Sequence, residues 1–196
     1  MDLAAFFKAE FAEHHDVARR SEAALSDAFA ALVGACAKSI RGGGKLMFFG
    51  NGGSAADAQH LATELTIRYK SNRAAIAAIA LTTDSSALTA AGNDLGFDRI
   101  FARQIEALGR PGDVAVAIST SGKSPNVIAA LKQAKAMGLT TAALGGRRGG
   151  DMVGLADYLL VVPSDTTARI QEMHLALGQM LCGALEIELG LTSSNH

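Results

Sequence analysis

The sequence contains few of the residues that cross-link a chain or restrict its backbone. Its 196 residues include two cysteines, three prolines and no tryptophan. Cys36 and Cys182 lie far apart and lack the CxxC spacing of a metal or redox motif, so we expect two buried free thiols in place of a disulfide scaffold. Because 49% of the residues are hydrophobic, a chain of this length can bury a core without such staples.

Net charge is also scarce, because 18 basic residues nearly balance 19 acidic ones. The formal charge of −1 and the lack of a basic cluster argue against a nucleic-acid surface. No charged-then-apolar leader opens the chain, and we expect no apolar run that spans a bilayer. The sequence therefore predicts a soluble cytoplasmic protein with neither a nucleic-acid nor a membrane partner.

Short apolar runs alternate with helical patterns along most of the chain. Strands are expected at residues 46–49, 76–81, 114–118, 140–144 and 158–162. Helices are expected at residues 54–65, 84–91, 97–108, 125–137 and 168–189. Uninterrupted apolar strands between helices predict an α/β fold with a parallel sheet covered on both faces.

The first 41 residues read as helix before any strand. This N-terminal helical segment, residues 1–41, is one helix or two, with Ser21 and Ser26 as candidate breaks. Its apolar face must bury on the sheet of the following domain, residues 42–196, or on another subunit.

The most informative stretch follows the first strand. Gly50, Gly52 and Gly53 permit a sharp turn, and Ser54 is a suitable N-cap for the helix that follows. A strand, a glycine turn and a helix N-terminus together form an anion site. The pattern matches neither a P-loop nor a dinucleotide fingerprint, so a nucleotide is not indicated.

A second such loop follows the third strand. Ser119, Thr120, Ser121 and Ser124 provide four hydroxyls in six residues at a helix start, where Pro125 suits the first helical position. Hydroxyls and amides can hold a phosphate monoester. An ordinary polar turn is the alternative, but two loops of this kind favour a phosphorylated small molecule.

His60 and Glu64 share one face of a helix at i and i+4. They could be a plain surface pair or ligands of one divalent ion, for which zinc is the usual metal. On the last helix Gln171 and Gln179 lie about 80° apart and share a broad face, and His174 falls on the other side of Gln171 from Gln179. An amide oxygen is an uncommon zinc ligand.

Four segments, residues 49–60, 92–94, 119–124 and 169–174, together resemble the sugar isomerase (SIS) family. The resemblance covers nearly the whole chain and is greatest to the bacterial phosphoheptose isomerases. It implies a flavodoxin-like five-stranded sheet and a homotetramer with sites between subunits. It also implies interconversion of sedoheptulose 7-phosphate and D-glycero-D-manno-heptose 7-phosphate, for heptose synthesis in surface polysaccharides such as lipopolysaccharide.

The same resemblance assigns roles to individual residues. Glu64 would be the base that forms a cis-enediol from the phosphorylated ketoheptose. One zinc ion per subunit would be held by His60, Glu64, Gln171 and the residue at 179. The substrate-binding residues would be Asn51, Gly52, Gly53, Ser54, Asn93, Asp94, Ser119, Thr120, Ser121, Ser124 and Gln171.

Gln179 departs from the family pattern, because the isomerases carry a histidine there as zinc ligand and proposed acid. An amide cannot donate and regain a proton near neutral pH. One alternative is therefore a catalytically impaired phosphosugar- or partner-binding protein, like the relatives that associate with a replication initiator. Those relatives tend to lack the acidic residue that matches Glu64, which favours the enzyme. An isomerase for another ketose phosphate stays open, since the loops do not measure sugar length.

Overall fold

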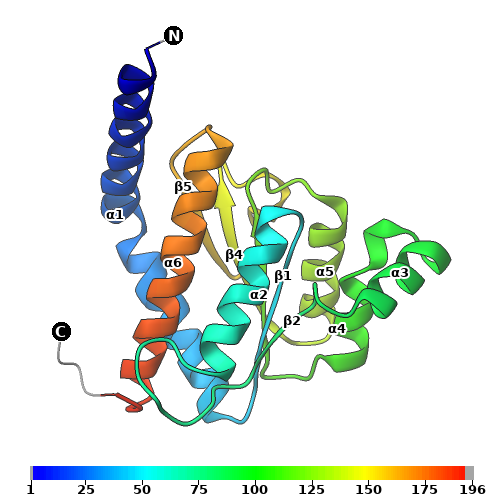
Figure 1. Cartoon of the computed structure of the whole chain (residues 1–196). Helices are drawn as coiled ribbons and strands as arrows, with labels where there is room; N and C mark the ends of the chain where they lie inside the picture. The colour runs from blue at the N-terminus through cyan, green and yellow to red at the C-terminus, as the bar shows by residue number, and fades with distance from the viewer. Residues whose placement is uncertain (1, 193–196) are drawn as a thin grey trace.

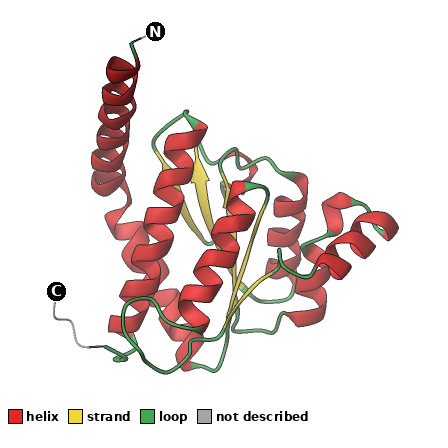
Figure 2. Ribbon diagram, viewed as in Figure 1, coloured by secondary structure: helices red, strands yellow, loops and turns green. Residues whose placement is uncertain are grey.

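A computed structural model describes residues 2–192, which form an α/β fold around a five-stranded parallel sheet (Figures 1 and 2). The strand order is β2-β1-β3-β4-β5, which is the flavodoxin-like order predicted above. The strands are β1 (Leu46–Gly50), β2 (Ala78–Ala80), β3 (Val114–Ser119), β4 (Thr140–Gly146) and β5 (Tyr158–Val162). β1, β3 and all of β4 except its first residue are buried, as their apolar runs predict.

Helices cover both faces of the sheet (Figure 1). They are α1 (Leu3–Arg41), α2 (Gly53–Thr66), α3 (Ser85–Asp94), α4 (Ala102–Leu108), α5 (Pro125–Ala136) and α6 (Thr167–Glu188). Alternate residues of β1 enter two separate cores. Leu46 and Phe48 pack with α1, α2 and α6, whereas Met47 and Phe49 pack with α4 and α5. The sheet therefore separates the α2–α6 layer from the α4–α5 layer.

α1 is one helix of 39 residues, with Asp2 as its N-cap and no break at Ser21 or Ser26. It joins the core from Val17 onward, through residues such as Leu32 and Cys36, while its N-terminal end projects from the body (Figure 1). By length and composition alone α1 passes as a membrane-spanning helix, which differs from the expectation that no segment would. Burial of its second half is typical of a core helix in a globular protein.

Several predicted boundaries were wrong. α2 begins at Gly53 with Gly52 at the N-cap, so Ser54 is a buried helical residue and not the cap. The predicted strand over residues 76–81 is paired only at Ala78–Ala80. The helix predicted at residues 97–108 is a 3-10 turn, Phe97–Arg99, followed by α4. Residues 92–94 continue α3, which was predicted to end at residue 91.

Candidate active site

The two informative loops follow neighbouring strands at the carboxyl edge of the sheet. One follows β1 and the other follows β3, and these strands pair in parallel from Leu46–Val114 to Gly50–Ile118. β2 lies on one side of this pair, and β4 and β5 lie on the other, so the strand order reverses here. Open parallel sheets bind ligands at such a point, outside the carboxyl ends of the strands.

A reciprocal amide pair joins the two loops. Asn51 Nδ2 donates to Asn126 Oδ1, and Asn126 Nδ2 donates to Asn51 Oδ1, each at 2.8 Å. Asn126 is 1% exposed, and its Oδ1 also accepts the Val127 backbone N–H at 2.9 Å. Asn51 is therefore held in one orientation by a buried partner.

The loop between β3 and α5 is preorganised by its own hydroxyls. Ser119 Oγ accepts the Gly122 N–H, and Ser121 Oγ accepts the Lys123 N–H, each at 3.2 Å. Each hydroxyl hydrogen is then available for donation to an anion. Ser124 is the N-cap of α5 and has an extended backbone conformation. Proline follows it at the first helical position, as predicted. Hydroxyl donors around a helix N-terminus suit a phosphate group.

A close approach between backbones shapes this loop. Gly122 has a φ of +63°, and a Cβ on it would lie 2.1 Å from Gly149 O. A Cβ on Gly150 would lie 2.6 Å from Ser121 O. Asp151 N donates to Gly122 O at 2.9 Å, so the segment after β4 backs the loop directly. Only glycine fits on either side of this contact.

His60, Glu64 and Gln179 converge between α2 and α6. His60 Nε2 lies 3.4 Å from Glu64 Oε1 and 3.2 Å from Gln179 Nε2. Two turns earlier on α6, Gln171 contacts the first loop, since a Cβ on Gly53 would lie 2.8 Å from Gln171 Nε2. The face of α6 shared by the two glutamines is thus the face that packs on α2.

The side chains of this cluster are partly exposed to solvent. The Glu64 side chain is 20% exposed and that of His60 is 43% exposed, so both are accessible to a small ligand. One turn before His60, burial raises the pKa of Asp57, and the neighbouring His60 opposes this shift.

The spacing in this cluster suits a tetrahedral zinc ion, although one donor atom does not. Ligand atoms about 2.0–2.1 Å from one zinc in tetrahedral geometry lie about 3.3–3.4 Å apart, close to both distances from His60 Nε2. Gln179 presents its nitrogen there, and only its oxygen can ligate, so the amide would have to turn over. Within residues 2–192 no three His, Cys, Asp or Glu side chains group as a metal site. The donors that converge on His60 are one carboxylate and one amide, and Gln171 as a further ligand stays a prediction.

His174 is a core residue and does not replace the missing histidine. It is fully buried, and its Nε2 donates to Gly145 O at 3.0 Å. Burial lowers the pKa of His174, while the bond to Gly145 raises it by less. The ring therefore anchors α6 to β4. On a helical wheel His174 lies about 60° from Gln171, on the side opposite to Gln179.

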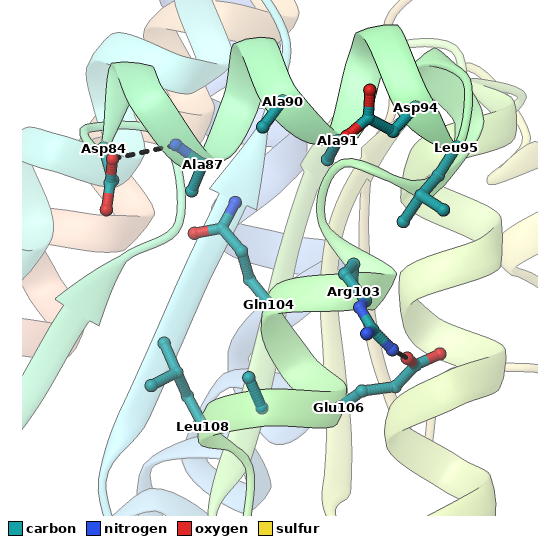
Figure 3. A pocket seen from close by; sticks show the side chains of 11 residues that line it. Asp84, Ala87, Ala90, Ala91, Asp94, Leu95, Arg103, Gln104, Glu106 and Leu108 are labelled. Carbon is teal, nitrogen blue, oxygen red and sulfur yellow. Dashed lines mark hydrogen bonds and ion pairs between the residues drawn. The ribbon is translucent and has the colours of Figure 1, made fainter.

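Asn93 and Asp94 lie apart from this cluster within one chain. They end α3, which Figure 1 shows on the opposite side of the molecule from α6. Asn93 Nδ2 donates to Asp94 Oδ1 at 2.7 Å. Asp94 also lines a hollow of about 670 Å³ between α3 and α4, where Arg103 pairs with Glu106 (Figure 3). Their role in sugar binding stays a prediction.

Sequence reasoning missed two buried side chains that hold the site. Asn126 closes the first loop onto the second, yet it carried no signal beyond its place in a hydroxyl-rich turn. Arg73 was placed in a polar loop, but its side chain is 1% exposed and pairs with Glu186, 113 residues away. No local pattern reports such a pair.

Known proteins are similar to this chain in both sequence and structure. The SIS domain model matches residues 11–146. The phosphoheptose isomerase of Paramagnetospirillum magneticum is 59% identical over 186 residues, covering 95% of this chain and 97% of that relative. The chain belongs to the phosphoheptose isomerases of the SIS domain family. The phosphoheptose isomerase of Campylobacter jejuni serotype O:6 is 52% identical over 177 residues, which are 90% of this chain and 95% of that one.

Solved phosphoheptose isomerases have the same fold. GmhA from Neisseria gonorrhoeae superimposes with a TM-score of 0.89 at 44% identity, covering 94% of this chain and 99% of that one. The enzyme from Francisella tularensis gives a TM-score of 0.92 at 34% identity, covering 95% and 100%. The resemblance to this family is thereby confirmed, and the partner-binding alternative is not favoured.

Proposed function

We propose that this phosphoheptose isomerase interconverts sedoheptulose 7-phosphate and D-glycero-D-manno-heptose 7-phosphate. The observation that carries the proposal is the presence in one chain of the Ser119–Ser124 hydroxyl loop at the start of α5 and of a His60–Glu64–Gln179 cluster between α2 and α6. The loop suits the phosphate end of the sugar, and the partly buried Glu64 carboxylate suits proton transfer next to the carbonyl. Membership of the family supports the same assignment.

In the proposed reaction Glu64 moves one proton between two carbons. It removes a proton from C1 of the ketose, which gives a cis-enediol, and returns the proton to C2 to give the aldose. The accompanying proton transfer between O1 and O2 does not use Gln179, because a carboxamide does not exchange a proton near neutral pH. Asn51, held by Asn126, would hydrogen-bond the sugar hydroxyls.

A zinc ion, one per subunit, is part of the proposal. It would be held by His60 Nε2, Glu64, Gln171 and the turned amide of Gln179. When bound, such an ion polarises the carbonyl and adjacent hydroxyl oxygens of the sugar. The distances from His60 Nε2 support Glu64 and Gln179 as members of this set, and the weak amide donors predict looser binding than a second histidine would give.

The test is proton NMR of the purified chain with sedoheptulose 7-phosphate in deuterated water. We expect an aldose product and deuterium on the carbon next to the carbonyl. Glu64→Gln should abolish both while leaving phosphate-dependent binding intact. Binding of the sugar without exchange in the wild-type chain would contradict the proposed activity and favour a phosphosugar-binding role.

We further propose that the enzyme works as a cytoplasmic homotetramer in heptose synthesis for surface polysaccharides. The exposed apolar side chains of the α1 arm, Leu3, Phe6, Phe7 and Phe11, support association with other copies. Asn93 and Asp94 would then reach the sugar in an assembled site.

A further inference from the structure

A buried ion pair ties together the two helices that carry the predicted zinc ligands. Arg73 lies in the segment between α2 and β2, which passes the C-terminal part of α6 (Figure 1). Its Nε donates to Glu186 Oε1 on α6 at 2.8 Å. The two side chains are 1% and 3% exposed, so the pair is shielded from solvent.

The other end of the Arg73 guanidinium caps α2. One terminal nitrogen donates to Glu64 O at 2.8 Å, and the other donates to Leu65 O at 2.7 Å. Carbonyls in the last turn of a helix lack partners within the helix. The bond from Arg73 satisfies Glu64 O, whereas Leu65 O also accepts the Ile76 N–H at 3.0 Å. Glu186 Oε1 also accepts the Tyr69 backbone N–H at 3.2 Å, which fixes the chain leaving α2.

The other contacts between α2 and α6 include His60 with Gln179 and a close glycine approach. Gly178 faces Leu61, so α6 approaches α2 closely there, and Gly183 faces Tyr69 in the segment that follows α2. Glycines offer no side chain to interlock with a partner, whereas a guanidinium fork bonds in one geometry. Glu186 lies two turns beyond Gln179 on the same face of α6.

From this geometry we propose that Arg73, together with Glu186, is a positioning residue for Glu64. The pair, called here the Arg73–Glu186 clasp, fixes the last turn of α2 against α6 so that the Glu64 carboxylate faces His60 and the two glutamines. The proposal rests on the proposed isomerase function for its kinetic consequence. The phosphate loop lies on β3 and α5, so the clasp sets the chemical step and leaves substrate binding nearly unchanged.

Three variants separate positioning from stability. Arg73→Lys keeps a charge for Glu186 but cannot bond both α2 carbonyls as a planar fork. Glu186→Gln keeps an oxygen for Arg73 and removes the charge that anchors the guanidinium to α6. The double variant Arg73→Met with Glu186→Leu removes both charges together, which avoids a buried charge without a partner.

Lys45→Met is the matched control. Lys45 Nζ pairs with the buried Asp113 Oδ2 at 2.5 Å, at the opposite edge of the sheet from the loops. The change breaks an ion pair with one buried partner without touching α2 or α6. We expect a lower melting temperature with kcat and KM unchanged.

For Arg73→Lys we expect kcat for sedoheptulose 7-phosphate to fall roughly tenfold, because a small displacement of a reacting group is costly. KM should change by less than about twofold, the pattern of a lost transition-state interaction. Hydrogen–deuterium exchange should become faster in residues 61–69 and stay unchanged in α5. Glu186→Gln and the double variant should lose kcat in the same way.

Unchanged kcat in Arg73→Lys would overturn the proposal. So would a second result, in which Arg73→Lys and Lys45→Met lower the melting temperature equally and Arg73→Lys loses no more kcat than Lys45→Met does. If every clasp variant unfolds, the clasp is a stabilising element only and the proposal is wrong. Inactivity of the wild-type chain would instead reject the proposed function. In that case unchanged exchange of residues 61–69 in Arg73→Lys rejects the clasp, and faster exchange there supports it.

Discussion

At the scale of single residues, position 179 has the largest expected effect on the chemistry. Gln179 contacts His60, yet its amide supplies one weak oxygen where an imidazole would supply a strong nitrogen ligand. Gln179→His should therefore raise zinc affinity by roughly 10–100-fold, the range that single changes around metal sites produce. It should also raise kcat by adding a titratable group.

Zinc content per subunit after dialysis and the isomerisation rate measure these two effects. Gln133→His on α5 adds a histidine away from the site and is the control. Equal zinc content in wild type, Gln179→His and Gln133→His would contradict the ligand assignment.

His174 makes stability depend on pH. Burial lowers the pKa of His174 in the folded chain, so below about pH 6.5 the unfolded chain binds a proton that the folded chain excludes. Stability should fall as the pH drops through this window, by up to about 1.4 kcal/mol per pH unit, until the folded pKa is reached.

Urea unfolding between pH 8 and pH 5 measures this slope. His174→Gln keeps a donor for Gly145 O and should show a shallower decline, whereas the exposed His15→Gln should decline as the wild type does. Equal slopes for His174→Gln and wild type would show that another group is responsible.

The two cysteines should be inert in the folded chain. Burial raises the pKa of Cys36 and of Cys182 to about 12 in each case, so almost no thiolate is present at pH 8. Reaction with a disulfide reagent should be negligible until denaturant is added, and then two thiols should react. Fast labelling of the native chain would place one thiol at the surface.

Residues that act through local spacing were predictable, and those that act through distant contacts were not. His60 and Glu64 are one helical turn apart, so their shared face follows from the sequence. The pairing of Gln179 with His60 needed the resemblance to a known family as well. Asn126 and Arg73 satisfy partners 75 and 113 residues away, and only the folded chain brings those partners together.

At the scale of elements, the close packing of α2 on α6 depends on glycine. A Cβ on Gly178 would lie 2.5 Å from Leu61 Cδ1, and Leu61 is itself buried. Gly178→Ala should force the two helices apart and reduce stability by about 1–3 kcal/mol, the usual result of overpacking.

Gly34 on α1 provides the matched comparison, because a Cβ there would meet nothing within 4 Å. Gly34→Ala should raise helix stability by about 0.5–1 kcal/mol. Chemical denaturation of both variants tests the pair. A stabilising Gly178→Ala would show that Leu61 yields without cost.

Helix and strand periodicity predicted nearly every element, whereas caps and short pairings were less predictable. Ser54 has a good capping side chain, but the tight turn at Gly52 places the N-cap two residues earlier. The predicted second strand lies at an edge of the sheet, where only one neighbour is available to pair with it. These boundaries depend on backbone geometry that side-chain patterns do not report.

At the scale of the whole molecule, the N-terminal end of α1 exposes apolar side chains that nothing else in residues 2–192 covers. Phe6, Phe7 and Phe11 are 55%, 62% and 49% exposed on one projecting helix. A sequence pattern predicts that such a face needs a partner, but a single chain does not identify that partner. We expect Phe7→Asp with Phe11→Asp to convert the proposed tetramer into smaller species.

Light scattering of the purified variant measures this change in mass. Phe97→Asp is the control, since Phe97 is 63% exposed on another surface. An unchanged mass for the α1 variant would mean that the arm does not hold the assembly. A monomeric wild-type chain would contradict the proposed homotetramer itself.

The glycine contact behind the phosphate loop has a consequence for protein engineering. Gly122 meets Gly149, and Gly150 meets the backbone at Ser121, so neither segment has its shape without the other. A designer who grafts residues 119–124 onto another α/β scaffold would move only half of the binding unit. The graft should hold phosphate only when residues 146–151 travel with it, which makes the two segments one transferable module.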